Sequence, residues 1–420
     1  MPQHSEQTNG GVNNSTKIVL ISSGQPSLNP RLVKEADTLA DNGFDVLVIY
    51  AFWNRWGTQM DEQLLPGKKW RHIRAGGRPD KNPLTYFTGR VIFKLSALAV
   101  KKLRLNYFAE MTIARASFFL QAEAKKHKAD LYIGHNLGAL PAVVKAAKKF
   151  NKPCGFDAED LHRYEVSDNI ADPDVKLKSF IENKYIPQVD YLTVSSDQIG
   201  MAYCKIFPDK APLTILNVFP KETEIAAKLN DATAPLRLFW FSQTIGHGRG
   251  LEEVIETLET VTPGIFELHL LGELSNGPFK TYLLDKQINI FIHSPIHPEK
   301  VIDFAGNFDI GLATETGVPV NRDLCLTNKI FTYMQAGLAV IASDTSAQQA
   351  FMQQYPTIGK VYKKGDSRAL SEILTYFHCN REALMESRVA ALALARKKLN
   401  WEIESVKFLN VVKQTLQQSI

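Results

Sequence analysis

The stretch Leu326–Asp344 constrains the fold of this chain more than any other. It begins with polar residues, continues as a short helix, stops at Gly337, and then runs as an uninterrupted apolar strand into a polar end. The apolar side of the helix carries Ile330, Phe331 and Met334 at helical spacing. A strand without polar alternation is typical of a parallel sheet covered on both faces. The stretch therefore predicts a helix–strand unit of an α/β domain.

The first turn of this helix predicts an anion site. The N–H groups at a helix N-terminus have no partners within the helix, and the helix dipole favours negative charge there. Asn328 and Lys329 lie in that turn, where a lysine opposes the dipole unless an anion such as a phosphate lies between them. The alternative, an ordinary α/β unit with a solvated lysine, stays open on this pattern alone.

Buried strands followed by helices recur along the whole chain. A chain of 420 residues is too long for one hydrophobic core and fits two domains of roughly 200 residues each. The first strand–helix turn lacks Gly-x-Gly-x-x-Gly, which argues against a dinucleotide cofactor. Besides Leu326–Asp344, the segments that carry predicted strands are Lys17–Ser23, Asp45–Tyr50, Ala129–Asn136, Lys152–Arg163, Tyr191–Ser196, Leu236–Ser242, Phe266–Gly272, Ile288–Ile292 and Asp309–Gly317.

Polar side chains follow two predicted strands of the first half. Ligands of an open parallel sheet bind outside the carboxyl ends of its strands, so we expect these residues to converge on one rim. Each of them alone is equally compatible with a capping or loop-ordering role. The residues are His135, Asn136, Asp157, Glu159 and Asp160.

The second half carries a glycine-bearing loop, Gln243–Gly250, between a predicted strand and a helix over Leu251–Leu258. Such a loop lets backbone N–H groups approach phosphates, and Arg249 adds a guanidinium. The loop by itself is a weak signal.

The string Asn-Lys-x-Phe-x-Tyr-Met-x-Ala-Gly-x-x-Val-Ile-Ala-Ser-Asp, which begins at Asn328, resembles the donor-site signature of glycosyltransferase family 4. These are retaining GT-B enzymes that use nucleotide-sugars. The resemblance implies two doubly wound, Rossmann-like domains facing each other across a cleft, with the donor diphosphate at the helix N-terminus. It also implies that the final helix, Trp401–Leu416, crosses back to the first domain.

Three other segments resemble parts of the same family. A string that begins at Pro30 and Arg31, in the turn before a helix predicted over Leu32–Asn42, resembles the family's first helix, where this loop lines the sugar-binding cleft. The segments around His135 and Asp157 resemble two acceptor-side segments, although Glu159 stands where the family usually has a histidine. The Gly-bearing loop is similar to a donor loop, with Gln243 near the usual arginine and Arg249 at the usual lysine.

The resemblance implies a division of the chain and a set of roles. The expected parts are a disordered lead (1–15), an acceptor-side domain (16–215), a nucleotide-sugar-binding domain (221–398) and a C-terminal helix packing on the first domain (399–420). Arg249 and Lys329 would stabilise the leaving diphosphate. Expected donor-binding residues are Ser242, Gln243, Gly248, Glu315, Gly317, Thr327 and Asn328. Expected acceptor-side residues are Arg31, His135, Asn136, Asp157, Glu159 and Asp160.

The expected function is transfer of a hexose from a nucleoside-diphosphate-sugar to a glycan or lipid-linked acceptor, with retention, in polysaccharide or glycolipid synthesis. We expect no metal ion and no cofactor besides the sugar donor. One departure concerns the Glu-x(7)-Glu signature of many family members, because Leu324 and Thr332 occupy its two positions. The alternatives are an inactive GT-B binding or scaffold protein and a GT-B sugar-nucleotide epimerase.

From its composition we expect a cytoplasmic protein. No apolar run approaches the roughly 18 residues needed to span a bilayer, and no basic-then-apolar signal pattern opens the chain. Four scattered cysteines without Cys-x-x-Cys argue against a zinc site and against a disulfide framework.

The segment Lys68–Phe108 differs in charge from the rest of the chain, because it carries eleven bases and one acid, Asp80. Within it, Val91–Tyr107 mixes apolar residues with bases, which is compatible with a core helix that has a solvated basic face. It is also compatible with a helix on an anionic membrane surface, at the inner face of the plasma membrane. No recognition motif accompanies the charge, so we expect no nucleic-acid partner.

Overall fold

The structure is a computed structural model that describes residues 16–103, 106–227, 234–275 and 277–418. The predicted disordered lead, residues 1–15, lies outside the described residues, as does Arg104 of the basic segment. Across the described residues, no helix combines the length and the apolar composition needed to cross a bilayer.

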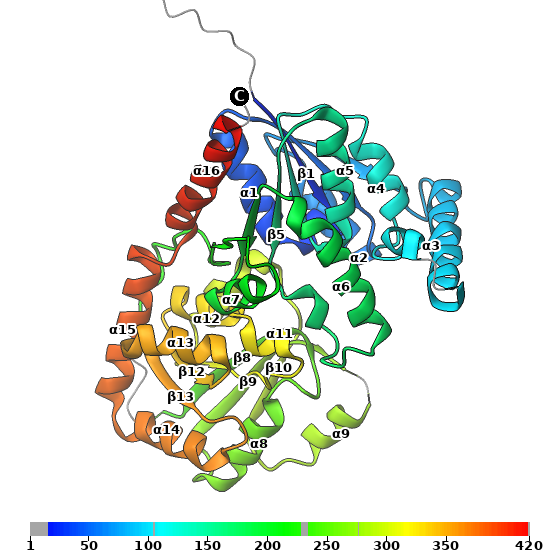
Figure 1. The fold of residues 1–420 in the computed structure, drawn as a ribbon. Coiled ribbons are helices and arrows are strands. Elements are labelled where there is room, and N and C mark those ends of the chain that lie inside the picture. The colour runs from blue at the N-terminus through cyan, green and yellow to red at the C-terminus, as the bar shows by residue number, and fades with distance from the viewer. Residues whose placement is uncertain (1–15, 104–105, 228–233, 276, 419–420) are drawn as a thin grey trace, which may run out of the picture. The chain divides into compact units, whose positions relative to one another are not determined.

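Two parallel sheets with surrounding helices form the molecule (Figure 1). The first has the strand order β3-β2-β1-β4-β5-β6-β7, and the second has the order β10-β9-β8-β11-β12-β13. Both follow the doubly wound pattern in which the order reverses beside the first strand of the sheet. The first set of strands is β1 (Lys17–Ser22), β2 (Asp45–Ala51), β3 (Arg71–Ala75), β4 (Leu131–His135), β5 (Cys154–Ala158), β6 (Tyr191–Val194) and β7 (Leu213–Thr214). The second set is β8 (Leu236–Ile245), β9 (Phe266–Leu274), β10 (Ile290–His293), β11 (Ile310–Ala313), β12 (Ala339–Ser343) and β13 (Gly359–Tyr362).

Helices and short 3-10 turns connect the strands. The α-helices are α1 (Pro30–Asp41), α2 (Arg55–Leu64), α3 (Pro83–Leu103), α4 (Ser117–Ala124), α5 (Leu140–Phe150), α6 (Pro173–Tyr185), α7 (Asp197–Ile206), α8 (Leu251–Thr260), α9 (Pro278–Leu284), α10 (Val301–Ala305), α11 (Val320–Leu324), α12 (Asn328–Gln335), α13 (Ser346–Gln354), α14 (Ser367–Cys379), α15 (Arg381–Lys397) and α16 (Trp401–Gln417). The 3-10 turns are η1 (Pro26–Leu28), η2 (Asn106–Met111), η3 (Leu137–Ala139), η4 (His162–Tyr164), η5 (Ile186–Gln188), η6 (Pro298–Lys300) and η7 (Pro356–Ile358).

The chain divides into two compact units, Met1–Gly155 with Lys413–Ile420, and Phe156–Val412. The division predicted from the sequence, at residues 215 and 221, stays a prediction. In the first unit, β1 and β2 are buried along almost their whole length, as their continuous aliphatic sequences predict. Helix α1 begins where Asn29 accepts a hydrogen bond from the Leu32 N–H, with Pro30 at the first helical position.

In the second unit, the stretch Leu326–Asp344 folds as predicted, with helix α12 followed by strand β12. Gly337 ends the helix in the left-handed region, at φ 69°. Helix α12 lies close against β11, because a Cβ atom at Gly311 would lie 2.1 Å from the ring of Tyr333. The Tyr333 hydroxyl donates to the Leu312 carbonyl at 3.1 Å. These contacts fix α12 against the strand whose carboxyl end it faces.

A buried arginine fixes α15 to the same region. Arg388 donates to Asp309 Oδ1 at 2.9 Å, to the Gly337 carbonyl at 2.8 Å and to the Phe308 carbonyl at 3.1 Å. Its guanidinium therefore meets both the start of β11 and the end of α12. Because Arg388 is buried and its donors are satisfied, these hydrogen bonds hold α15 against the start of β11 and the end of α12.

Candidate functional site

The N-terminus of α12 has no side-chain cap. Thr327 occupies the cap position, but its side chain accepts no hydrogen bond from the first turn, and that turn contains no acid. The Thr327 hydroxyl is buried and has no hydrogen-bond partner among the described residues. Asn328, the next residue, is exposed. The N–H groups of this turn thus lack the side-chain partner that most helices of this kind provide.

Lys329 does not extend into solvent, as the sequence-based alternative supposes, but is buried in an ion pair. Its Nζ atom lies 2.5 Å from Glu315 Oε1, and the two side chains are only 9% and 6% exposed. The ammonium also lies 5.3 Å from the ring centroid of Trp240, within the range of a cation–π contact. The structure therefore brings together two predicted donor-site residues, Lys329 and Glu315, and adds Trp240, which the sequence did not single out.

Glu315 is held by the ends of two neighbouring strands, β11 and β12. The Ser343 hydroxyl accepts from the Glu315 N–H at 2.8 Å and lies 2.9 Å from the Glu315 carbonyl. The Gln348 side-chain amide donates to the Ala313 and Ser343 carbonyls, both at 3.0 Å. All of these groups are buried. Ser343 was visible in the sequence only as a polar strand end, and no sequence signal marks Gln348.

The glycine-bearing loop is shorter than predicted. Strand β8 continues to Ile245, with an irregularity in its pairing between Phe241 and Thr244, so the first three residues of the predicted loop, Gln243 to Ile245, belong to the strand. This continuation was not predicted, because the strand loses its apolar pattern where its side chains become exposed. The loop proper therefore begins after Ile245.

Three contacts anchor that loop. The Thr314 hydroxyl donates to the Arg249 carbonyl at 3.1 Å, and the Arg322 guanidinium donates to the Gly248 carbonyl at 2.9 Å. The Gly248 N–H donates to Glu252 Oε1 at 2.8 Å. This N–H is thus already partnered by an acid of α8. Gly250 has φ 75°, and a Cβ atom there would lie 2.8 Å from the Thr314 Cβ atom.

The Arg249 side chain is half-buried and makes no hydrogen bond or ion pair with any other described residue. Its backbone is fixed to Thr314, the residue that precedes Glu315. The backbone of Arg249 is consequently held next to the strand end that carries the Lys329–Glu315 pair.

Gly317 lies beyond the end of β11 with φ 72°. A Cβ atom at this position would lie 2.8 Å from Lys364 Nζ. That ammonium pairs with Asp323 Oδ1 at 3.0 Å, and the Asp323 carboxylate also contacts Ser346. Gly317 therefore leaves room for a second lysine near the strand ends, and this lysine is paired as Lys329 is.

The positions of the Glu-x(7)-Glu signature have other roles. Thr332 is buried within α12. The Leu324 carbonyl accepts a hydrogen bond from the Ser196 hydroxyl at 2.6 Å. The acid of this region comes instead from Glu315, at the end of the neighbouring strand.

Two of the acceptor-side candidates form a buried cluster in the first unit. His135 Nε2 lies 3.1 Å from Glu35 Oε2, and Arg31 Nε lies 3.5 Å from Glu35 Oε1, with all three side chains at most 1% exposed. Glu35 was not singled out in the sequence. Through Glu35, this buried network joins α1 to the last residue of β4.

Asn136 follows His135 in a left-handed conformation, with φ 65°. Its Oδ1 atom accepts from the Ser22 hydroxyl at 3.0 Å. A non-glycine residue in this region carries backbone strain, and such strain concentrates at functional sites. Asn136 is therefore the acceptor-side candidate with the clearest local signal in the first unit.

The remaining candidates lie in the second unit, at the end of β5. Asp157 is buried and accepts from the Thr193 hydroxyl at 2.6 Å, and the Glu159 carbonyl accepts from the Ser195 hydroxyl. Asp160 contacts α11, because its Oδ1 atom accepts from Asn321 Nδ2 at 2.9 Å and from Cys325 Sγ at 3.0 Å. Burial, with Asp160 beside it, raises the pKa of the Cys325 thiol.

His162 forms a second buried ion pair close to Asp160. Its Nδ1 atom lies 2.5 Å from Glu165 Oε1, and Lys178 Nζ lies 2.6 Å from Glu165 Oε2. Burial alone would lower the pKa of His162, but the Glu165 carboxylate outweighs it and raises this pKa to about 9. Burial opposes ionisation of Glu165 too, and the two cations lower the pKa of Glu165 to about 2.

Two groups of acidic residues in the second unit have the spacing of possible metal ligands. Asp160, His162 and Glu165 offer three ligand atoms within 4.8 Å of one another, but their oxygen atoms already accept from Asn321, Cys325 and Lys178. Asp172 and Asp174 form an Asp-x-Asp pattern. Asp172 caps α6, and Asp174 pairs with Lys178 at 3.0 Å. The carboxylates of both arrangements are therefore already engaged by protein groups.

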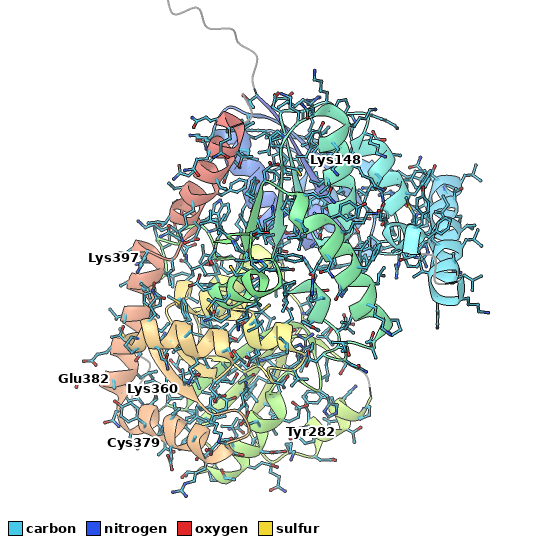
Figure 2. The ribbon with its side chains drawn as sticks, in the orientation of Figure 1. Lys148, Tyr282, Lys360, Cys379, Glu382 and Lys397 are labelled. Atoms are coloured by element: carbon cyan, nitrogen blue, oxygen red, sulfur yellow. The ribbon has the colours of Figure 1, made fainter. Side chains whose placement is uncertain are left out.

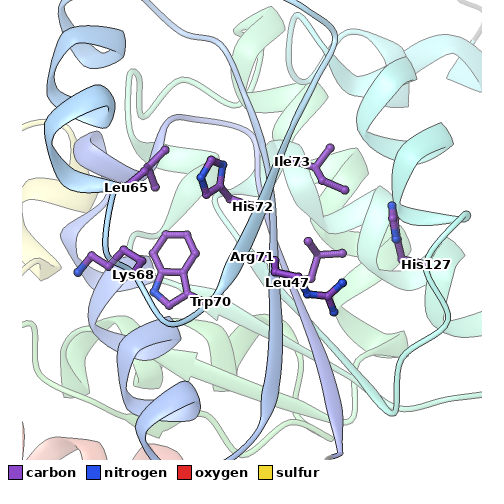
Figure 3. Close-up of a pocket in the computed structure, with 8 residues that line it drawn as sticks. All are labelled: Leu47, Leu65, Lys68, Trp70, Arg71, His72, Ile73 and His127. Atoms are coloured by element: carbon purple, nitrogen blue, oxygen red, sulfur yellow. The ribbon is translucent and has the colours of Figure 1, made fainter.

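A hollow of about 450 Å³ lies in the first unit beside edge strand β3 (Figure 3). Leu47 and Arg71, which pair across β2 and β3, lie near the starts of their strands. The hollow is thus distant from the carboxyl ends at which ligands of parallel sheets bind. It is lined by Leu47, Leu65, Lys68, Trp70, Arg71, His72, Ile73 and His127.

The whole chain resembles solved glycosyltransferase structures. It matches the Anabaena HepE structure in complex with UDP with a TM-score of 0.66 and 14% identity, covering 95% of this chain and 100% of that one. It matches sucrose-phosphate synthase from Thermosynechococcus elongatus with a TM-score of 0.69 and 16% identity, covering 96% and 100%. The fold is GT-B.

A third match is S. aureus TarM, in a complex that contains UDP, with a TM-score of 0.67, 11% identity and coverage of 94% and 99%. No protein-family model matches the chain, and no curated protein matches it. At these identities the likeness establishes the GT-B fold, which confirms the predicted fold class. Activity has to be argued from the chain's own residues.

Proposed function

We propose that this GT-B protein is a glycosyltransferase that moves a hexose from a nucleoside-diphosphate-sugar to a glycan or lipid-linked acceptor, in polysaccharide or glycolipid synthesis. One observation carries the proposal. At the carboxyl ends of β8, β11 and β12, an uncapped helix N-terminus and the buried Lys329–Glu315 pair occur together with the backbone of Arg249, whose guanidinium has no partner among the described residues. UDP-bound neighbours of the same fold support a nucleotide-sugar as the donor.

The two cations have different parts in this proposal. Lys329 is neutralised by Glu315, so the pair adds little net charge and instead holds the Glu315 carboxylate in place. The net positive potential for a leaving diphosphate comes from Arg249 and the N–H groups of α12. Fixed donors of this kind stabilise developing charge without reorganising during the reaction.

We further propose that transfer proceeds with retention and without a metal ion. The acceptor would attack on the face that the diphosphate leaves, and the departing phosphate oxygen would take its proton. No dedicated side-chain base is then required. Glu315 and Gly317, beside the cations, would meet the sugar, and Asn136, Glu159 and Asp160 are the acceptor-side candidates. Family 4 membership stays part of this proposal, supported by the match around Asn328.

A thermal-shift panel of nucleoside diphosphates and their sugars tests the proposal. A ligand at 100 times its dissociation constant stabilises a protein by about 2.7 kcal/mol. We expect a uridine or guanosine diphosphate sugar to raise the melting temperature, and Arg249→Ala to remove most of that rise. Arg368→Ala is the matched control, because Arg368 is 89% exposed in a surface ion pair on α14.

Two outcomes would decide against the proposal. If no nucleotide raised the melting temperature of the wild-type protein, the donor assignment would be wrong. If the rise were unchanged in Arg249→Ala, Arg249 would not bind the donor. Product analysis separates the alternatives. A binding or scaffold protein would hold the donor without turnover, whereas an epimerase would convert the donor in the absence of any acceptor.

A further inference from the structure

Helix α3 presents an uncovered apolar face in the first unit. Five large apolar side chains of this helix are spaced by three or four residues and therefore lie on one side of it. We call this set the α3 stripe. Exposed apolar patches on a folded unit mark interaction surfaces. The stripe consists of Leu84, Phe87, Val91, Leu95 and Leu98, which are 85%, 58%, 55%, 62% and 50% exposed.

The opposite side of α3 provides its contacts with the rest of the unit. Gly89 is buried there, and a Cβ atom at this position would lie 3.3 Å from the Phe119 ring. The Tyr86 ring meets Phe52 edge-on at 5.7 Å, and Ser96 is buried. Figure 1 shows α3 lying outside α4, farther from β1. Because the helix already packs through its other side, the α3 stripe is not the side that holds α3 in the fold.

The bases of the two halves of Lys68–Phe108 are used differently. In and before β3, Lys68, Lys69 and Arg71 pair with acids of the same unit at 2.7, 2.7 and 2.8 Å, and so does Arg78. Along α3 and just before it, Lys81, Lys94, Lys101 and Lys102 form no ion pair with any described residue. From Lys81 to Ala109 the sequence contains no acid at all. The available positive charge is therefore concentrated around the α3 stripe.

We propose that α3 docks on the surface of an anionic lipid bilayer, with the α3 stripe among the acyl chains and the neighbouring lysines on the headgroups. Arg90, Lys94 and Lys101 recur along one flank of the stripe at helical spacing, the arrangement of helices that lie in the membrane interface. A second copy of this chain is the poorer occupant, since a symmetric contact would set these bases against their own copies. The inference does not depend on sugar transfer.

The structure also changes which residues carry the surface. Two of the apolar residues in the predicted segment Val91–Tyr107, Ile92 and Phe93, are half-buried and do not belong to the stripe. Leu84 and Phe87, which precede the predicted helix, belong to the stripe because α3 begins at Pro83. The docking surface is thus α3 itself, without the β3 half of the basic segment.

Co-flotation of the full chain with vesicles tests this inference. The probes are vesicles of equimolar phosphatidylglycerol and phosphatidylcholine, and vesicles of phosphatidylcholine alone. We expect binding to the anionic vesicles that weakens with salt, and binding to the neutral ones that is weaker by about tenfold or more. Val91→Ser with Leu95→Ser, and separately Lys94→Glu with Lys101→Glu, should each reduce anionic binding by about tenfold or more.

Matched controls make the same changes elsewhere. Lys148→Glu with Lys397→Glu alters the charge equally at two exposed lysines, both labelled in Figure 2, and Val389→Ser with Val406→Ser removes two valines that are 50% and 53% exposed. We expect neither control pair to change binding. Thermal melts should show every variant folded. No binding to anionic vesicles, equal binding to both vesicle types, or equal losses in controls and α3 variants would overturn the proposal. A drop from dimer to monomer caused by the Val91→Ser, Leu95→Ser change, without lipid, would assign the stripe to a second copy and would likewise overturn it.

Discussion

Lys329 and Arg249 are the two cations that the sequence assigned to one phosphate, and the structure gives them opposite surroundings. Lys329 is buried against Glu315 and Trp240. Arg249 is half-buried, and its guanidinium has no partner among the described residues. Yet the two are close along a chain of contacts, because Thr314 binds the Arg249 carbonyl and Glu315 follows it. The two side chains therefore carry the same formal charge in different environments, one paired and buried and the other partly exposed.

The difference follows from the cost of burying charge. A buried ammonium loses its hydration and persists only where an opposite charge replaces it. Once paired, Lys329 contributes little net field, and its main effect is to fix Glu315. An arginine that is partly hydrated has no such requirement and stays available to an incoming anion. Burial thus distinguishes Lys329, which we propose organises the site, from Arg249, which we propose binds the diphosphate.

Lys329→Ala should have the largest effect on stability of any change compared here. It would leave the Glu315 carboxylate buried without its cation, which costs roughly 3–5 kcal/mol when one partner of a buried pair is removed. Urea denaturation would show this as a lower midpoint with an unchanged slope.

The double variant Lys329→Ala with Glu315→Gln is the control for this prediction. It removes both charges, so we expect it to recover a large part of the lost stability. We expect this variant to stay folded, and it then allows nucleotide binding to be measured without the ion pair. A loss below about 1 kcal/mol in Lys329→Ala would show that the pair is solvated, and the contrast with Arg249 would disappear.

His162 offers a buried cation of the same kind that can be titrated. Its pKa is about 9 in the folded protein, against an ordinary value near 6.5. The stabilisation by its charge is therefore complete below about pH 6.5 and is lost as the pH rises toward 9, by about 2–3 kcal/mol. Urea midpoints measured across this range should fall in the wild type and fall less in His162→Gln. His297→Gln, at an exposed ion pair, should follow the wild type. If the urea midpoint fell equally with pH in all three proteins, His162 would not be a buried charge.

Much of the fold was predictable because buried parallel strands leave continuous apolar runs. The stretch around β12 shows this, and so do β1 and β2. Strand β3 was missed because it lies at the edge of its sheet and carries Arg71, His72 and Arg74, which leave no apolar run to recognise. The continuation of β8 to Ile245 was missed for the same reason.

The site was predictable in its location and not in its pairing. The sequence placed Lys329, Glu315 and Arg249 at strand and helix ends, and the structure brings the backbones of these segments together. It could not place Glu315 against Lys329, because that contact depends on β11 and β12 lying side by side. Trp240 was equally hidden, since a tryptophan within a buried strand reads as core.

Arg249→Ala should have the smallest effect on stability and so completes the comparison. With no ion pair to break, its free energy of unfolding should stay within about 0.5 kcal/mol of the wild type. Turnover, measured as nucleoside diphosphate released from the donor found in the thermal-shift panel, should nevertheless fall by about 100-fold. Arg249→Lys keeps the positive charge but loses the bidentate donor, so its turnover should lie between those of the wild type and Arg249→Ala. A large loss of stability in Arg249→Ala would mean that Arg249 is engaged much as Lys329 is, and burial would no longer distinguish the organising cation from the binding one.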